Sequence, residues 1–311
     1  MALWKETVMF IDVHGHAFRK EQAPFMGMKE GLFYTPEKLL KIYDKFGIEK
    51  GMLLPVVSPE IYLPQTNEDV LEICQEFPDR FIPFCNIDPR AMTNSGDAPL
   101  DQLLRYYRDK GCKGLGEVMP NMPLMHPKVQ NLFRHAEAAG LPVIFDGSDQ
   151  LDGDFGLYDD PGLPQLEHTL QRYPNLIIFG HGPIFWSEIG KLETPGERGY
   201  IYRYDGEQIG RLPSGPIKEE GIVPKLLRRY PNLYGDLSDF TPVNALSRDP
   251  EYGPKFLDEF QDRLLFGTDL ITTSDQVGMA DLLINWLKTK KISETVFNKI
   301  ARENTIKLFE L

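Results

Sequence analysis

Three polar side chains stand near the end of the apolar stretch VMFIDVHGHAF, residues 8–18. They are Asp12, His14 and His16, each two positions from the next. Residues at i, i+2 and i+4 of a strand point to one face of its sheet. Because neutral imidazole is the commonest protein ligand for zinc-like ions, two histidines at this spacing predict a metal site.

Four further polar residues follow other apolar stretches of the chain, in the segments GLGEV, VIFDGS, IIFGHG and LLFGTD. The complete set of candidate metal ligands is His14, His16, Glu117, Asp146, His181 and Asp269. Carboxylates that are buried together lose their hydration and repel one another unless a cation lies between them. Any single member has an ordinary alternative, an ion pair or a helix cap, but the set as a whole predicts one or two divalent ions.

Eight short apolar runs, separated by amphipathic stretches, carry these residues. The runs are 8–14, 50–58, 80–88, 113–120, 141–148, 175–182, 232–239 and 263–270. Strands that alternate with helices favour right-handed βαβ units and a parallel sheet. We predict an α/β fold, a (β/α)₈ TIM barrel, in which the C-terminal ends of all strands meet at one mouth. The alternative is an α/β protein of another topology, but a doubly wound sheet would more often carry a glycine-rich loop after its first strand.

The intervals between these runs predict two additions to the barrel. A long insertion after strand six, 191–221, is rich in glycine, proline, tyrosine and charge, and we interpret it as a wall of the site or as a solvated decoration. Tyr200, Tyr202 and Tyr204 alternate within it and predict a short hairpin strand. The segment 293–311 predicts an extra amphipathic helix that packs on the barrel. We treat residues 1–311 as a single domain.

The composition excludes several classes of function. The chain has 311 residues and a net charge of −12, which argues against a nucleic-acid partner. We expect no membrane span and no signal peptide, since the chain lacks a long apolar run and a basic, apolar N-terminus. Cys74, Cys85 and Cys112 lack a C-x-x-C spacing and predict reduced thiols in a cytoplasmic protein. We expect a small-molecule substrate, and a homodimer is one state that the sequence allows.

The chain resembles the amidohydrolase superfamily in its amidohydrolase-2 branch, which includes the aminocarboxymuconate-semialdehyde decarboxylase-like enzymes. The resemblance runs from IDVHGH through GHGPIFWSEI and LLFGTD to ENTIKLFEL. It implies a TIM barrel with zinc or another divalent ion in its mouth. It also implies that His14 and His16 are the strand-one ligands, that Asp269 is the strand-eight ligand, and that His181 is a second-metal ligand or a catalytic group. Glu117 lies where binuclear members carry a bridging carboxylate or a modified lysine.

Asp146 departs from the pattern of this family, which usually places a histidine at the end of strand five. As an oxygen ligand, Asp146 would make the site more anionic and would favour manganese beside zinc. Alternatively, it lies outside the metal's direct ligands and orients a histidine or the substrate.

These residues predict a metal-dependent hydrolase that activates water to cleave an ester, lactone or amide-like bond. Asp269 is then the base, and His181 polarises the carbonyl or donates a proton. The first alternative is a metal-dependent decarboxylase of an unsaturated or aromatic acid, which needs a cationic clamp such as Arg19, Lys20 or Arg90. The second is a catalytically degenerate binding barrel. Trp186 follows strand six and either stacks on a planar substrate or anchors the insertion.

Overall fold

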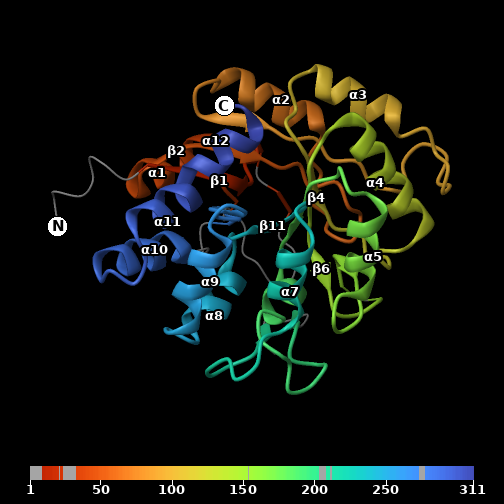
Figure 1. Ribbon diagram of the computed structural model, residues 1–311. Helices are drawn as coiled ribbons and strands as arrows, with labels where there is room; N and C mark the ends of the chain where they lie inside the picture. Colours follow the sequence, from red (N-terminus) through yellow and green to blue (C-terminus); the bar gives the residue numbers. More distant parts are fainter. Residues whose placement is uncertain are drawn as a thin grey trace.

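The structure is a computed structural model of the chain. It describes residues 9–20, 22–23, 33–152, 154–202, 208–210, 212–272 and 277–311. Figure 1 shows a central group of strands surrounded by helices. None of the helices in these ranges combines the length and the hydropathy needed to span a bilayer.

Eight strands form the centre of the fold, and each overlaps one of the eight predicted runs. They are β1 (Phe10–Gly15), β2 (Ile48–Leu53), β3 (Phe81–Pro83), β4 (Leu115–Val118), β5 (Val143–Phe145), β8 (Ile178–Gly180), β11 (Leu233–Asp236) and β12 (Leu264–Leu265). They make two sheets of parallel strands, ordered β1-β2-β3 and β12-β11-β8-β5-β4.

Backbone contacts join the two sheets at both of their edges. The Cys85 amide donates to the Gly114 carbonyl at 3.0 Å, and Cys85 forms a parallel bridge with Leu115. On the other side, the Val13 amide donates to the Phe266 carbonyl at 3.0 Å. The arrangement is an α/β TIM barrel, as predicted.

The helices that cover the strands begin and end where local chemistry requires it. They are α1 (Pro36–Phe46), α2 (Asn67–Glu76), α3 (Asp101–Asp109), α4 (Pro127–Ala139), α5 (Pro164–Arg172), α7 (Ile222–Arg229), α9 (Tyr252–Phe260) and α10 (Gly278–Lys288), with the short α6 (Pro183–Ser187) and α8 (Phe240–Ser247). For α1, the Thr35 hydroxyl accepts from the Lys38 amide, and Pro36 occupies the first turn. Gly47 ends α1 with φ 72°, a left-handed conformation that favours glycine.

The core has one layer inside the barrel and another between strands and helices. The inner layer contains Val13, Met52, Leu54, Phe84, Ile144, Phe179 and Leu265. The end of the chain completes this layer, since the Phe309 ring lies 5.7 Å from that of Phe84 and 6.2 Å from that of Phe179. The predicted C-terminal helix is divided into α11 (Glu294–Asn298), a π-helical turn (Lys299–Glu303) and α12 (Asn304–Phe309). Ile300 lies in the π-helical turn, and its carbonyl accepts from the Phe266 amide of the barrel at 3.0 Å.

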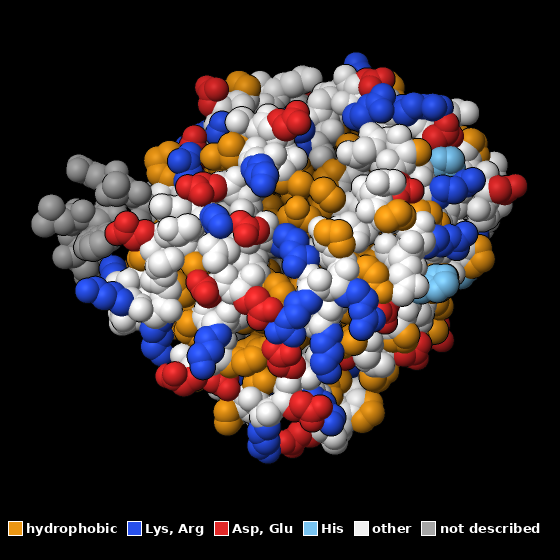
Figure 2. Space-filling view, viewed as in Figure 1, with side chains coloured by type: hydrophobic (Ala, Val, Ile, Leu, Met, Phe, Trp, Pro, Cys, Tyr) orange, Lys and Arg blue, Asp and Glu red, His pale blue; other side chains and the backbone are white. Residues whose placement is uncertain are grey.

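The insertion after the sixth barrel strand lies between α6 and α7, in the green and cyan loops at the bottom of Figure 1. It contains the predicted hairpin, in which β9 (Tyr200–Tyr202) pairs antiparallel with β10 (Gln208–Gly210). Tyr204 lies outside the described residues. A second small sheet, β6 (Gly147–Ser148) with β7 (Leu157–Tyr158), follows β5. On the face in Figure 2, acidic and basic side chains are interspersed.

Candidate metal centre and active site

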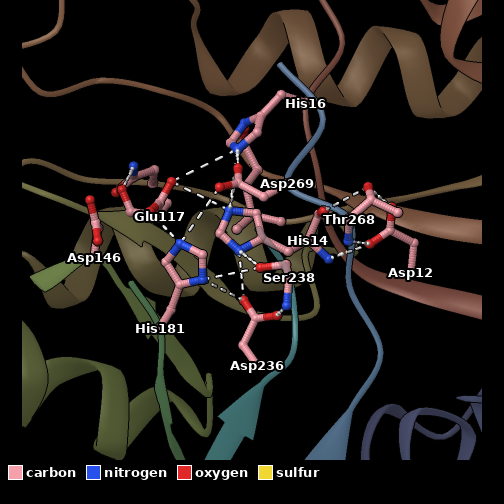
Figure 3. A network of polar contacts seen from close by, with 12 residues as sticks. Asp12, His14, His16, Glu117, Asp146, His181, Asp236, Ser238, Thr268 and Asp269 are labelled. Carbon is pink, nitrogen blue, oxygen red and sulfur yellow. Dashed lines mark hydrogen bonds and ion pairs between the residues drawn. The ribbon is translucent and has the colours of Figure 1, made fainter. Parts of the chain in front are cut away.

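Two histidines from the end of β1 meet at the mouth of the barrel (Figure 3). The Nε2 atoms of His14 and His16 lie 3.2 Å apart, and both side chains are fully buried. Two nitrogens bound to one zinc ion at about 2.0–2.1 Å have a similar separation in a tetrahedral site. The pair therefore has the geometry that the spacing in the sequence predicts.

Carboxylates from two other strand ends complete this group. Glu117 of β4 places Oε2 3.3 Å from His14 Nε2. Asp269, which follows β12, places Oδ1 3.2 Å from His16 Nε2 and 3.5 Å from His14 Nε2. Each of the four residues offers a ligand atom within 4.8 Å of the other three. We call these residues, His14, His16, Glu117 and Asp269, the quartet.

His181 and Asp146 lie beside the quartet. His181 Nε2 is 3.5 Å from Glu117 Oε1 and 3.7 Å from Asp269 Oδ2. Asp146 forms a second candidate group with Glu117 and His181, and its own Oδ1 accepts from the Gly147 amide at 2.7 Å. In Figure 3, Asp146 lies on the far side of Glu117 from His16. The structure therefore brings all six predicted residues together, with strand four rather than strand five completing the quartet.

The other ring nitrogen of each histidine contacts an oxygen atom. His16 Nδ1 lies 2.8 Å from the Leu54 carbonyl, which obliges Nδ1 to donate. His14 Nδ1 lies 2.6 Å from Asp236 Oδ2, and His181 Nδ1 lies 3.0 Å from Ser238 Oγ. These contacts direct all three Nε2 atoms toward the carboxylates of Glu117 and Asp269.

Asp236 is a site residue that our sequence reasoning missed. It ends β11 in the seventh apolar run, whose segment NLYGDLSD also contains Ser238 and Asp239. Glu117 and Asp146 were identified because they are polar residues at the ends of predicted strands. The same criterion applies to this run. Applied to all eight runs, it would have found Asp236.

Asp12 does not join the histidines, although strand alternation predicts one face for all three. Its carboxylate accepts from the Tyr43 hydroxyl at 2.7 Å and from the Thr268 hydroxyl and amide at 2.5 and 2.9 Å. The register of β1 shifts between Asp12 and Gly15, which breaks the alternation. Burial raises the pKa of Asp12 to about 6. Asp12 ties β1 to α1 and to the segment after β12.

The charges of the site favour a cation at its centre. Burial lowers the pKa of His14, but the charges of Asp269, Asp236 and Glu117 raise it well above its usual range. Burial raises the pKa of Asp269, but the charge of His14, the hydrogen bond to His16 and the charge of His181 together outweigh this effect and leave the pKa lowered. Without an ion, the carboxylates would therefore keep an imidazole protonated, whereas a divalent ion supplies the positive charge and leaves the imidazoles that bind it, those of His14 and His16, neutral.

The donor set fits a divalent metal ion. Asp269 Oδ1 is buried and has no hydrogen-bond partner among the described residues, although it faces two imidazole nitrogens. An unsatisfied buried carboxylate oxygen costs free energy that a metal ligand bond offsets. Two imidazoles and two carboxylates suit zinc and also manganese.

Neither of the two predicted substrate contacts lies where a substrate would meet it. The Arg19 guanidinium points to α2, where it lies 2.8 Å from Glu76 and 3.6 Å from Glu72. Trp186 is 0 % exposed, and its indole Nε1 donates to the Asp236 carbonyl at 3.0 Å. The stacking role is therefore wrong for Trp186, whose ring packs 6.2 Å from that of Phe256 in α9, and its role as an anchor of the insertion stays a prediction.

Comparisons with known proteins agree with this architecture. The amidohydrolase family model matches residues 11–209 and 210–311. An uncharacterized TIM-barrel protein from Bordetella bronchiseptica is 17 % identical, with a TM-score of 0.64 over 97 % of this chain and 99 % of that one. A probable 2-pyrone-4,6-dicarboxylic acid hydrolase from Acinetobacter baumannii is 16 % identical, with a TM-score of 0.58 and coverages of 97 % and 99 %. The 5-carboxyvanillate decarboxylase from Novosphingobium aromaticivorans, solved with manganese, is 15 % identical, with a TM-score of 0.56 and coverages of 98 % and 97 %.

A search of curated proteins found no match. The family model nevertheless spans almost the whole barrel, and the strand-end residues that suggested the family converge at its mouth. The chain is an enzyme of the amidohydrolase family, in the amidohydrolase-2 branch.

Proposed function

We propose that this enzyme hydrolyses an ester, lactone or amide-like bond of a small molecule, with a divalent ion held by the quartet. One observation carries the proposal. The buried oxygen Oδ1 of Asp269 has no hydrogen-bond partner in the part of the chain that the structure describes, yet lies 3.2 Å from His16 Nε2 and 3.5 Å from His14 Nε2. A divalent ion in this position lowers the pKa of a water molecule from about 16 toward 7.

Asp269 and His181 then divide the proton transfers between them. Asp269 accepts a proton from the attacking water and delivers it to the leaving group. His181, which does not bind the ion in this arrangement, acts as an imidazolium with a proton on each ring nitrogen. Its Nδ1 lies 3.0 Å from Ser238 Oγ, and its Nε2 donates a proton to the developing oxyanion. Both side chains lie beside Glu117, whose carboxylate helps to hold the ion.

We propose zinc as the resident ion, with manganese as the alternative. Imidazole nitrogens favour zinc, whereas the carboxylate share of the quartet suits manganese as well. A second ion would use Glu117, Asp146 and His181, which form a group of their own. In that case His181 would be a ligand and could not donate a proton.

Decarboxylation is the second candidate, because the enzymes of similar fold include one named a 5-carboxyvanillate decarboxylase. That reaction needs a cation to bind the substrate carboxylate. Arg19 is paired with α2, and Arg90 lies 2.9 Å from Glu60 and 2.6 Å from Asp88. Both of these arginines are paired with acids, which supports hydrolysis over decarboxylation.

A substrate panel tests the proposal. Zinc-loaded and manganese-loaded protein are offered lactones, esters and amides, with proton release as the signal, and aromatic or unsaturated acids, with released CO₂ as the signal. Asp269→Asn is the matched control. We expect metal-dependent proton release that the variant lacks. Release of CO₂ without hydrolysis would replace the proposal with the decarboxylase, and no turnover with any compound would favour a binding barrel.

A further inference from the structure

One carboxylate contacts two histidines that come from different strands of the barrel. Asp236 is fully buried at the end of β11. Its Oδ2 lies 2.6 Å from His14 Nδ1, on β1, and 3.3 Å from His181 Nδ1, which follows β8. Figure 3 shows Asp236 below both rings, on the side opposite to the quartet's carboxylates.

Asp236 is itself fixed by two other contacts. Its Oδ1 accepts from the Ser238 amide at 3.0 Å, and its backbone carbonyl accepts from the buried Trp186 indole at 3.0 Å. Ser238 Oγ lies 3.2 Å from His14 Nδ1 and 3.0 Å from His181 Nδ1. The carboxylate therefore has little freedom to move away from either ring.

The chemistry of this contact determines where each ring carries its proton. An ionised carboxylate only accepts hydrogen bonds, so the ring nitrogen that faces it must donate. A neutral imidazole has one N–H, so a proton at Nδ1 leaves a lone pair at Nε2. In both rings, Nε2 is the atom that faces Glu117.

We propose that Asp236 is a shared positioning residue, which holds both His14 and His181 with the proton on Nδ1 and Nε2 directed into the site. The expected effect on metal binding rests on the proposed function, whereas the position of the two ring protons does not. Asparagine has the same shape but also offers an NH₂ group, which can donate to Nδ1 and favour the tautomer that carries a proton on Nε2. That tautomer cannot bind a metal ion through Nε2.

Nuclear magnetic resonance of ¹⁵N-histidine-labelled, metal-free protein tests the hydrogen bonds directly. His16 is an internal control, because its Nδ1 donates to the Leu54 carbonyl and does not contact Asp236. We expect wild-type protein to show protected Nδ1–H signals for all three rings, assigned with His14→Gln and His181→Gln. Asp236→Asn should lose or shift the signals of His14 and His181 and keep that of His16. Unchanged signals for His14 and His181 in Asp236→Asn would overturn the proposal.

Zinc affinity, measured by competition with a chromophoric chelator, provides the second readout. We expect Asp236→Asn to bind zinc about 10–100-fold more weakly than wild type, since outer partners of metal-bound histidines have effects of this size. Asp159→Asn is the matched control, because Asp159 is equally buried and its carboxylate accepts from the amides of Gln165 and Leu166 rather than from a ring. Equal losses of zinc affinity in both variants would mean that Asp236 is only structural.

Two further results keep the proposal falsifiable. Ser238→Ala retains the carboxylate, and we expect it to keep the His14 signal and zinc affinity within a few-fold of wild type. Loss of the His14 signal in Ser238→Ala would assign the anchoring to the hydroxyl and overturn the proposal, even if Asp236→Asn does not fold. Wild-type protein that binds no zinc would contradict the proposed function, whereas the ring signals would still decide the role of Asp236.

Discussion

At the scale of single residues, the site is built from side chains that each have two functions. His14 offers Nε2 to the quartet and uses Nδ1 to contact Asp236 at 2.6 Å. Asp269 has φ 52°, a backbone conformation that non-glycine residues rarely adopt, and its buried Oδ1 faces the histidines. Strain of this kind, at a residue whose Oδ1 has no hydrogen-bond partner among the residues that the structure describes, agrees with a role in catalysis.

Asp269→Asn tests that role. The amide cannot accept a proton from water, so we expect the rate on the substrate found by the panel to fall about 10²–10⁴-fold. Turnover measured at saturating metal separates this effect from weaker metal binding. Near-normal turnover in Asp269→Asn would show that another group is the base.

The residues at strand ends were predictable where the signal lies in neighbouring residues of the sequence. The spacing of His14 and His16, and the apolar runs before Glu117 and Asp269, are visible in the sequence. The position of Asp12 was not, because it depends on a register shift within β1. The burial of Trp186 depends on how α6 packs against the barrel, which no local pattern encodes.

At the scale of elements, a buried ion pair attaches the insertion to the loop that follows β5. Arg198 is 1 % exposed, and its guanidinium lies 2.9 Å from Glu188 at the end of α6. It also donates to the Asp159 carbonyl, and Glu188 accepts from the Gly162 amide at 2.8 Å. The insertion is therefore anchored to the barrel at this point, in agreement with a wall rather than a loose decoration.

Arg198→Met should lower the free energy of unfolding by about 3–5 kcal/mol, because it leaves Glu188 buried without its partner. Adding Glu188→Gln removes that charge and should recover part of the loss. Urea unfolding of the single and double variants measures both effects. If the double variant is less stable than Arg198→Met, the uncompensated charge is not the cause.

Asp159 makes stability depend on pH in a defined direction. Burial raises its pKa from 3.8 to about 6, so between these values the folded chain binds a proton that the unfolded chain lacks. The contribution of Asp159 to stability is therefore largest at low pH and decreases as pH rises from about 4 to about 6. Urea unfolding at a series of pH values measures this effect. The difference in unfolding free energy between wild type and Asp159→Asn should decrease from about pH 4 to about pH 6 and stay constant above pH 6. A difference that rises with pH would contradict the sign of this shift.

The elements themselves were largely predictable from the sequence. Apolar runs located all eight barrel strands, and Thr35 with Pro36 marked the start of α1. The hairpin in the insertion was visible in its alternating tyrosines. The π-helical turn near Ile300 was not, since it accompanies a hydrogen bond to Phe266 on a different element.

At the scale of the whole molecule, the barrel gathers residues that are up to 255 positions apart, from His14 to Asp269, into one group at its mouth. Cys74, Cys85 and Cys112 are free and buried, and burial raises the pKa of Cys74 far above its usual range. A homodimer remains a prediction.

The thiols should be inert in the folded enzyme. We expect none of the three to react with Ellman's reagent under native conditions, and all three to react in guanidinium. A thiol that reacts rapidly in the native protein would show that the barrel opens near that cysteine.

The central claim is that the strand ends form a metal centre. Metal content per chain, measured by plasma mass spectrometry on protein purified without a chelator or a metal-binding tag, tests it most directly, with His14→Ala as the control. We predict one or two equivalents of a divalent transition metal in wild type and their loss in the variant. Protein that stays free of metal after reconstitution with zinc and with manganese would contradict the account.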